Sequence, residues 1–264
     1  MPPSAADHCY FGSPPLALAH RGGARYAPNV GIENTLRAFE NAVALGFRYL
    51  ETDVHTTSDE VVVAFHDTHL DRVTDRTGPI AALPWRQVRL ARVGAREPIP
   101  RLDGLLEAFP DARVNIDIKS PGAVGPLWRV IERHAAYDRV CVGSFSDRSL
   151  ARFRRLAGPR VATAAGRLGT AALRLLPAQL SRWIASPAQV LQIPLAHDVA
   201  GRSLPLVTTS LLCTAHRLGK QVHVWTIDDP ALMHTLLDLG VDGLVSDRIE
   251  LLRDVLIERG VWDG

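Results

Sequence analysis

Residues 47–66 have the sequence FRYLETDVHTTSDEVVVAFH and contain two apolar, β-rich runs, 47–54 and 61–65, separated by a short polar stretch. A parallel crossover between two strands needs about a dozen residues, which is more than the chain between Val54 and Val61 provides. The two runs are therefore expected to form an antiparallel hairpin that turns near residues 57–60. With 61–65 set aside, eight strand candidates remain, including 47–54, and eight parallel strands close an α/β barrel.

The rest of the chain alternates short apolar runs with segments that are apolar at helical spacing. Strands are expected at 16–19, 47–54, 114–119, 140–145, 161–165, 190–193, 222–226 and 243–246, and helices at 33–45, 101–109, 127–134, 208–218, 231–239 and 249–259. This rhythm and the length of 264 residues predict an α/β fold, a (β/α)8 TIM-type barrel with one antiparallel hairpin strand. A doubly wound open sheet is the alternative, but no GxGxxG motif follows the first strand.

We expect a single barrel domain over residues 1–264, with a small inserted lobe at about 67–100. This stretch has no strong period and contains Gly78-Pro79 and three further prolines. A second stretch, 168–184, is apolar at helical spacing and is interrupted by Pro177. We interpret it as core or lid packing, with contact to a membrane surface as the alternative.

Composition argues against several classes of function. The chain has 30 Lys and Arg residues and 28 Asp and Glu residues, a net charge of +2, and we expect no nucleic-acid partner. The arginines between 148 and 182 are interpreted as a solvated face, with polyanion binding as the alternative. Three well-separated cysteines argue against a disulfide framework. No signal sequence or long apolar run is present, which predicts a cytoplasmic protein without membrane insertion, and the oligomeric state stays open.

Polar side chains collect at the carboxyl ends of the expected strands, which form the active end of a TIM barrel. Because side chains alternate faces along a strand, one face of strand 47–54 carries two carboxylates, and one face of strand 114–119 carries an amide, a carboxylate and an amine. These residues are Glu51 and Asp53, then Asn115, Asp117 and Lys119, and His20 ends the first strand. A two-residue turn at 58–59 would place His66 opposite Glu51, so that a second histidine joins the group.

This set of side chains indicates a reaction class. The three carboxylates, with room for water, suit a hard cation such as Mg²⁺ or Ca²⁺ better than zinc. Arg21 and Lys119 suit an anionic substrate, since a guanidinium binds a phosphate through two hydrogen bonds. His20 and His66 fit the roles of proton donor and acceptor near neutral pH. Together these residues predict metal-assisted cleavage of a phosphodiester.

Several motifs, in this order along the chain, resemble those of the glycerophosphodiester phosphodiesterases, a family built on a phospholipase-C-like barrel. The resemblance spans about residues 16–260, with no matching motif at 168–206. The motifs are Ala19-His20-Arg21-Gly22, Glu33-Asn34-Thr35, Glu51-Thr52-Asp53-Val54, His66-Asp67, Asn115-Ile116-Asp117-Ile118-Lys119, Val224-Trp225-Thr226 and Val241-Asp242-Gly243-Leu244-Val245-Ser246-Asp247.

The resemblance implies a role for each matching residue. His20 is similar to the proton acceptor of the family and His66 to its proton donor. Metal ligands are implied at Glu51 and Asp53, phosphate contacts at Arg21 and Lys119, and an aromatic wall of the site mouth at Trp225. Glu33 is expected either to orient Arg21 or to cap the helix that follows, and we favour the cap.

Asp117 departs from the family, which usually has Glu at this position. Because Asp is one methylene shorter, it is expected to reach the metal through water or to favour the larger Ca²⁺. The implied activity is metal-dependent hydrolysis of a small glycerophosphodiester to sn-glycerol 3-phosphate and an alcohol. The alternatives are an enzyme similar to lysophospholipase D or sphingomyelinase D, with a lipid substrate, and a non-catalytic phosphodiester-binding barrel.

Overall fold

The computed structural model describes residues 4–175, 186–199 and 201–263. Eight parallel strands follow one another in the order β8, β7, β6, β2, β1, β13, β12, β9, and a parallel bridge between Ala164 and Val190 joins the two ends of this order. Their bounds are β1 Leu16–His20, β2 Tyr49–Thr56, β6 Arg113–Ile118, β7 Val140–Gly143, β8 Ala162–Thr163, β9 Val190–Ile193, β12 Gln221–Val224 and β13 Gly243–Ser246. The predicted TIM-type barrel is confirmed.

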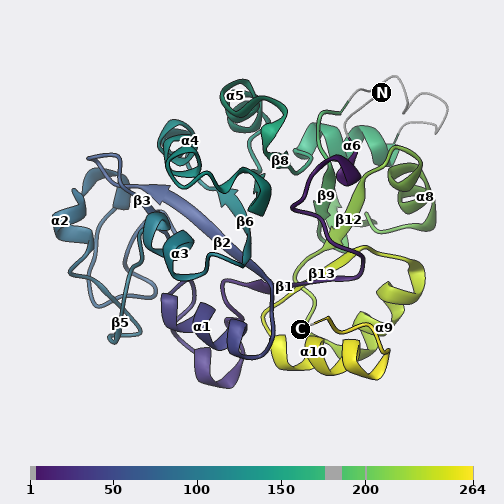
Figure 1. Cartoon of the computed structure of the whole chain (residues 1–264), viewed down its shortest axis with the longest axis horizontal. Coiled ribbons are helices and arrows are strands. Elements are labelled where there is room, and N and C mark those ends of the chain that lie inside the picture. Colours follow the sequence, from purple (N-terminus) through teal and green to yellow (C-terminus); the bar gives the residue numbers. More distant parts are fainter. Residues whose placement is uncertain (1–3, 176–185, 200, 264) are drawn as a thin grey trace.

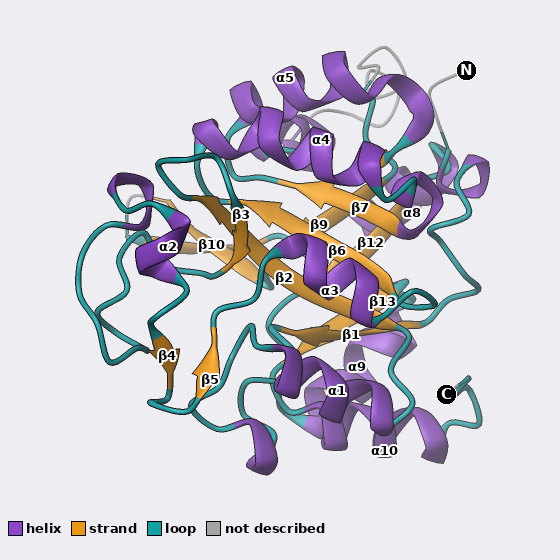
Figure 2. Cartoon of the chain, turned by 60° about the vertical axis from the view of Figure 1, so that its left-hand side comes forward, coloured by secondary structure: helices purple, strands orange, loops and turns teal. Residues whose placement is uncertain are grey.

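Helices cover the outside of the strands (Figure 1). They are α1 Leu36–Ala44, α3 Leu102–Ala108, α4 Val124–Arg133, α5 Asp147–Ala157, α6 Arg167–Leu175, α8 Thr209–Arg217, α9 Pro230–Leu239 and α10 Ile249–Glu258, with short 3-10 turns at η1 Ala5–Asp7, η2 Ala27–Asn29, η4 Pro121–Ala123, η5 Ala136–Arg139 and η6 Gly158–Arg160. Figure 2 shows α4 and α5 on one side of the strands and α1 and α10 on the other. The six helices expected from the sequence are present, with ends that differ by a few residues.

Helix α5 is an element that the sequence analysis does not assign. Because this segment is rich in arginine, its sequence shows no clear apolar period, although Leu150 and Phe153 are fully buried. Arg154 also points inward and donates to the carbonyl oxygen of Ala164 at 2.7 Å, beside the bridge that closes the barrel. The other arginines of α5 are exposed, as expected for a solvated face.

The hairpin that decides the strand count is present, but its turn differs from the prediction. Strand β3 Val62–Ala64 pairs antiparallel with β2. The amide of Thr57 donates to the carbonyl oxygen of Val61 at 3.0 Å, which closes a three-residue loop, and Glu60 in that loop has a left-handed φ of 62°. Three-residue hairpin loops commonly end in a left-handed residue. The predicted two-residue turn is wrong, and the true register is shifted by one residue.

Residues 67–100 form a small lobe beside β3. The lobe contains η3 Ile80–Ala82, α2 Trp85–Val88 and a two-stranded sheet of β4 Arg92–Val93 and β5 Glu97–Pro98. It packs around an apolar cluster distinct from the main core, made of Val63, Phe65, Leu70, Ile80, Val88, Ala91, Val93 and Ile99. In Figure 2 the lobe elements α2, β4 and β5 lie to the left of the barrel strands.

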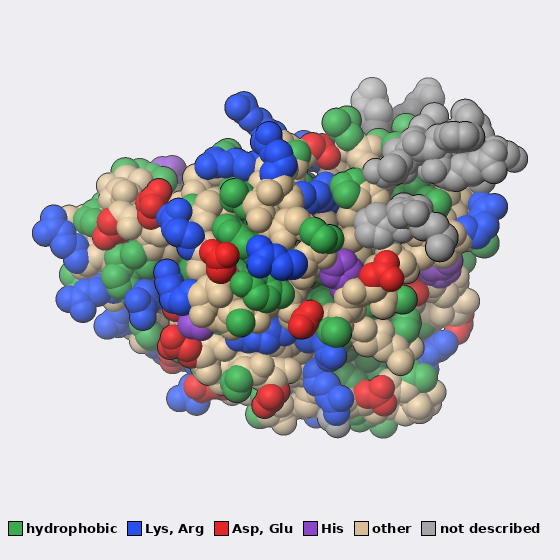
Figure 3. Space-filling model, turned by 45° about the horizontal axis from the view of Figure 1, so that its top comes forward, with side chains coloured by type: hydrophobic (Ala, Val, Ile, Leu, Met, Phe, Trp, Pro, Cys, Tyr) green, Lys and Arg blue, Asp and Glu red, His purple; other side chains and the backbone are tan. Residues whose placement is uncertain are grey.

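The stretch 168–184 is described only in part. Helix α6 covers its beginning, and residues 176–184 lie outside the described residues. A hairpin of β10 Ala196–Val199 and β11 Arg202–Pro205 follows β9 and was not predicted, because its short polar strands show no clear alternation. Within the described ranges, no helix has the length and apolar character needed to cross a bilayer. On the face shown in Figure 3, basic and acidic side chains are intermingled.

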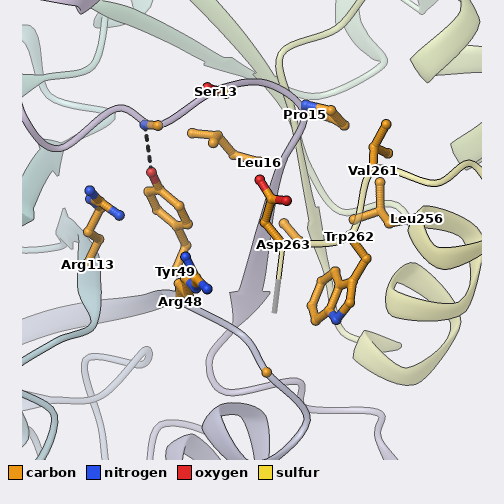
Figure 4. A pocket seen from close by; sticks show the side chains of 13 residues that line it. Ser13, Pro15, Leu16, Arg48, Tyr49, Arg113, Leu256, Val261, Trp262 and Asp263 are labelled. Carbon is orange, nitrogen blue, oxygen red and sulfur yellow. Dashed lines mark hydrogen bonds between the residues drawn. The ribbon is translucent and has the colours of Figure 1, made fainter.

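The interior of the barrel is apolar at the end where the strands begin. Leu16 and Leu18 of β1 and Tyr49 of β2 pack there with Tyr10 from the chain that precedes β1. The Tyr49 hydroxyl donates to the carbonyl oxygen of Tyr10 at 2.9 Å and accepts from the amide of Gly12 at 2.8 Å. A pocket of about 240 Å³ opens beside this contact, between Tyr49 and the C-terminal residues (Figure 4). Glu51, Asp53 and Asp117 lie further along β2 and β6, toward the opposite end of the barrel.

Candidate active site

The carboxyl ends of β1, β2 and β6 place four predicted site residues in two adjacent layers. His20 on β1 lies in register with Glu51 on β2. One layer further along, Asp53 on β2 lies in register with Asp117 on β6. The strand register therefore brings together residues that are as much as 97 positions apart in the sequence (117 − 20).

Two cations neutralise the carboxylate of Asp53. Lys119 Nζ lies 2.9 Å from Asp53 Oδ1, and Arg21 Nε lies 3.2 Å from Asp53 Oδ2, to which Asn34 also donates. Burial opposes ionisation of Asp53, but the charges of Lys119 and Arg21 outweigh it and hold the pKa below its usual value. Lys119 Nζ also lies 2.7 Å from Asp117 Oδ2, yet the enclosed position of Asp117 raises the pKa of that carboxyl.

Glu51 is the buried carboxylate with the least compensation. It is 6% exposed, and its Oε2 accepts from the backbone amide of Arg21 at 3.1 Å. Burial and the neighbouring charge of Asp53 raise the pKa of Glu51 to about 7. A cation bound beside these two carboxylates would relieve both the desolvation and the repulsion. The chemistry of this donor set therefore fits a hard divalent cation.

The described residues do not arrange Glu51, Asp53 and Asp117 around a common point. Among them, no group of three or more His, Cys, Asp or Glu side chains is placed to hold a metal ion. The amine of Lys119 bridges Asp53 and Asp117. Glu51 and Asp53 share one face of β2 and are the two carboxylates best placed for an ion.

His20 is held by carboxylates on two sides. Its Nδ1 lies 2.7 Å from Asp247 Oδ1, just beyond the end of β13, and its Nε2 lies 3.8 Å from Glu51 Oε2. Burial disfavours the imidazolium of His20, but the charges of Glu51 and Asp247 outweigh it and raise the pKa. With Nδ1 bonded to Asp247, Nε2 is the ring atom that points to the carboxylate cluster.

His66 reaches the same end of the barrel by a different route from the one predicted. In the observed hairpin register the residue facing His66 would be Thr52, not Glu51, but β3 already ends at Ala64. His66 lies one residue beyond the last hydrogen bond of this ladder, which the amide of Phe65 donates to the carbonyl oxygen of Asp53 at 2.9 Å. The hairpin thus brings His66 next to β2, the strand that carries Glu51 and Asp53.

The imidazole of His66 also has a carboxylate partner. His66 Nδ1 lies 2.6 Å from Asp67 Oδ1, and its backbone carbonyl oxygen is 3.0 Å from His55 Nε2. The side chain is about one-third exposed, at 34%, so it is accessible from solvent. Both candidate histidines thus bind a carboxylate through Nδ1, an arrangement that orients the ring and leaves Nε2 for chemistry.

Glu33 orients Arg21 and does not cap helix α1. The cap is Thr35, whose hydroxyl accepts from the amide of Ala38 at 3.2 Å. Glu33 Oε1 instead accepts from Arg21 NH1 at 3.1 Å. The favoured interpretation of Glu33 as a cap is wrong, because a Ser or Thr next to the first helical residue satisfies the free amides better than a carboxylate further away.

Trp225 lies next to the cluster and contacts an aromatic residue that the sequence analysis does not single out. Its ring packs edge-to-face against Phe145, with ring centroids 5.7 Å apart. Lys119 Nζ lies 5.6 Å from the centre of the Phe145 ring, and Phe145 is 48% exposed. The aromatic pair thus borders the site at its exposed edge.

Sequence reasoning missed Asp247, Asn34 and Arg72 as parts of the site. Asp247 follows the last strand at its carboxyl end, so the rule that located Glu51 and Asp53 would have found it. Asn34 supports Asp53 from a left-handed backbone position at φ 60°, which no spacing rule reveals. Arg72 lies in the aperiodic lobe, where the sequence gives no indication of direction.

The eight-stranded barrel and the charged cluster at the carboxyl ends of its strands define an α/β-barrel protein with an interior polar site. The profile of the "Glycerophosphoryl diester phosphodiesterase family" matches residues 20–251. The chain belongs to this family, which confirms the resemblance inferred from its motifs and the prediction of a phosphodiesterase.

Three relatives illustrate the similarity. The chain is 44% identical over 253 residues to "Probable glycerophosphodiester phosphodiesterase 2" of Mycobacterium tuberculosis, covering 94% of this chain and 93% of the relative. It is 28% identical over 275 residues to the "Lysophospholipase D" of Homo sapiens, covering 90% of this chain and 85% of the relative. The solved structure of an Oleispira antarctica phosphodiesterase in complex with the product sn-glycerol-3-phosphate has a TM-score of 0.76 and 23% identity, covering 92% of this chain and 97% of the other.

Proposed function

We propose that this protein hydrolyses glycerophosphodiesters to sn-glycerol 3-phosphate and an alcohol. The observation that carries the proposal is the pair of histidines, His20 and His66, each bound to a carboxylate through Nδ1 at the same end of the barrel. An acid and a base on either side of a reacting phosphorus are what phosphodiester cleavage requires. The product named in the Oleispira antarctica complex belongs to that protein and supports the choice of substrate here.

In this mechanism His20 accepts the proton of the attacking hydroxyl. Attack by water gives sn-glycerol 3-phosphate directly, whereas attack by the glycerol hydroxyl of the substrate gives a cyclic phosphate that water opens in a second step. Asp247 holds the ring of His20 so that Nε2 faces the reacting group. Arg21 and Lys119 bind the phosphate oxygens and stabilise the charge that develops on them. His66 donates a proton to the leaving oxygen, and Asp67 stabilises its protonated form. The P–O bond to the alcohol breaks as the bond to the attacking oxygen forms.

A divalent cation, Mg²⁺ or Ca²⁺, is part of the proposal. Glu51 and Asp53 would hold it, and Asp117 would join them when Lys119 moves to the substrate phosphate. When bound, such an ion neutralises charge on the non-bridging phosphate oxygens. The shorter side chain of Asp117, in place of the Glu usual in the family, leaves the choice between the two ions to experiment.

A second candidate function differs from the first in its substrate, which would be a lipid. The human relative named lysophospholipase D favours a lipid substrate for this chain, and the exposed Phe145 beside Trp225 offers an apolar edge at the site. We favour the small diester, because the relative with 44% identity bears the glycerophosphodiester phosphodiesterase name.

One assay tests both candidates. Purified protein is incubated with glycerophosphocholine or with lysophosphatidylcholine, each with Mg²⁺ and with Ca²⁺ separately. Release of sn-glycerol 3-phosphate from glycerophosphocholine, with a kcat/KM above that for lysophosphatidylcholine, supports the proposal. Choline release from lysophosphatidylcholine at the higher kcat/KM would favour the lipid enzyme, and no turnover of either would contradict the proposed reaction.

A further inference from the structure

Arg72, in the inserted lobe, contacts two carboxylates that belong to different parts of the site. Its Nε donates to Asp67 Oδ2, and its NH2 donates to Asp67 Oδ1 at 3.2 Å. The same NH2 donates to Glu33 Oε1 at 2.7 Å, and NH1 donates to Glu33 Oε2 at 3.3 Å. The guanidinium thus makes a two-point contact with each carboxylate, the geometry in which arginine fixes an orientation best.

Each of these two carboxylates also contacts a residue that has a role in the proposed reaction. Asp67 Oδ1 lies 2.6 Å from His66 Nδ1. Glu33 Oε1 accepts from Arg21 NH1 at 3.1 Å. A continuous chain of charged contacts therefore runs from the proposed proton donor, through Arg72, to the proposed phosphate contact.

Both histidines contact a carboxylate through Nδ1, but only His20 lies within a regular strand. His20 ends β1, and the ladder with β2 fixes its backbone. His66 lies two residues beyond the end of β3, with a side chain that is 34% exposed. The contact with Asp67, and through it with Arg72, is what orients the imidazole ring.

The expected energies indicate that Arg72 positions other side chains and contributes little to the stability of the fold. Arg72 is 49% exposed at its side chain, and ion pairs of that exposure contribute about 0–1 kcal/mol to folding. A misplacement of about 1 Å in a group that transfers a proton can reduce turnover by about 100-fold. Loss of Arg72 should therefore affect catalysis far more than it affects unfolding.

We propose that Arg72 is a positioning residue that sets the orientation of His66 through Asp67 and that of Arg21 through Glu33. The inference rests on the proposed function, in which His66 protonates the leaving alcohol. The inserted lobe thus contributes to catalysis, because its Arg72 links the side chains around His66 to those around Arg21.

The test uses two substrates with the same glycerol phosphate and different leaving groups. Choline leaves from glycerophosphocholine as an alkoxide that needs a proton, whereas p-nitrophenol leaves from the p-nitrophenyl ester of sn-glycerol 3-phosphate without one. For Arg72→Gln we expect kcat on glycerophosphocholine to fall by about 10- to 100-fold. The kcat on the nitrophenyl ester should change far less, while KM rises for both substrates because Arg21 is no longer held.

Arg76→Gln is the matched control, because Arg76 lies in the same lobe and is also exposed, and its Nε donates to the carbonyl oxygen of Leu90. It should keep kcat and KM for both substrates. Arg72→Lys should recover part of the lost kcat, since an amine retains the charge without the two-point geometry. If Arg72→Gln does not fold, Asp67→Asn tests the same arm with a smaller change, and it should show the same dependence on the leaving group.

The outcomes separate this inference from the proposed function. If wild type does not hydrolyse glycerophosphocholine, or if His66→Ala loses both substrates equally, the proposed function or the role of His66 is wrong. If both of those hold and Arg72→Gln keeps full kcat on glycerophosphocholine, the positioning role alone is overturned. An equal loss on the two substrates by a folded Arg72→Gln would also overturn it, because that pattern indicates a general structural defect.

Discussion

The two halves of the candidate site are built in different ways. The half around His20 belongs to the barrel: strand β1 carries the histidine, β2 carries Glu51 and Asp53, and Asp247 follows β13. The half around His66 lies between the end of β3 and the inserted lobe, and ion pairs orient its side chains.

This difference indicates how the fold divides its tasks. Strand register fixes backbone positions without any contribution from the side chains, so the barrel half is preorganised by the same hydrogen bonds that hold the fold together. The lobe half is ordered by exposed charged contacts, which contribute little to stability but much to orientation. A change in the lobe should therefore affect one step of the reaction, whereas a change in the barrel should affect all of it.

The largest expected effect is the removal of divalent cations, which disables the barrel half. Chelation should reduce turnover of glycerophosphocholine to background, and added Mg²⁺ or Ca²⁺ should restore it. The same ions should raise the melting temperature, because binding to the folded state alone contributes about 2.7 kcal/mol at 100 times Kd. Calorimetry of Glu51→Gln should show no such rise. Full activity after exhaustive chelation would contradict the metal proposal.

Removal of either histidine side chain should have the second largest effect on turnover. His20→Ala and His66→Ala should each lower kcat on glycerophosphocholine by about 100- to 10,000-fold, the range for general acid or base catalysis. The two should differ on the p-nitrophenyl ester, where His66→Ala regains most of its rate and His20→Ala does not. His69→Ala, an exposed histidine three residues further along the lobe, is the control and should keep wild-type rates. Near-normal turnover of either site variant would refute the role assigned to it.

The carboxylate partners of the two histidines should show a smaller effect of the same kind. Asp247→Asn and Asp67→Asn each keep the shape of the side chain but weaken the hold on the ring, and we expect a loss of about 100-fold or less in kcat. Steady-state kinetics with both substrates should show that only Asp67→Asn depends on the leaving group. The comparison between the halves fails if Asp247→Asn shows that dependence as well.

Prediction from the sequence succeeded where strand geometry decides the outcome. Parity along 47–54 and 114–119 placed Glu51, Asp53 and Asp117 correctly, because alternation of side chains is a property of any strand. It failed for the hairpin turn, since one extra loop residue shifts the register and no rule gave Glu60 its left-handed conformation. The contact of Lys119 with Asp53 was not predicted either, because spacing along the sequence does not show how far a long side chain reaches.

The smallest expected effect comes from loosening each half through its own core. Ile80 in the cluster of the lobe and Ile116 in the core of the barrel are both fully buried, and Ile→Val at either position should lower the free energy of unfolding by about 1 kcal/mol. The two variants should therefore lose the same free energy of unfolding but differ in how they affect the rates on the two substrates.

Ile80→Val should reduce turnover of glycerophosphocholine slightly more than turnover of the nitrophenyl ester, because the lobe carries Asp67 and Arg72, which orient the proton donor His66. Ile116→Val should change both rates by the same factor, because β6 supports groups that act on the phosphate of either substrate. Denaturant unfolding establishes that the two variants are matched, and the ratio of the two kcat values gives the answer. A ratio that is the same for both variants would mean that the lobe and the barrel respond as one body, and that the division between a strand-built and an ion-pair-built half has no kinetic consequence.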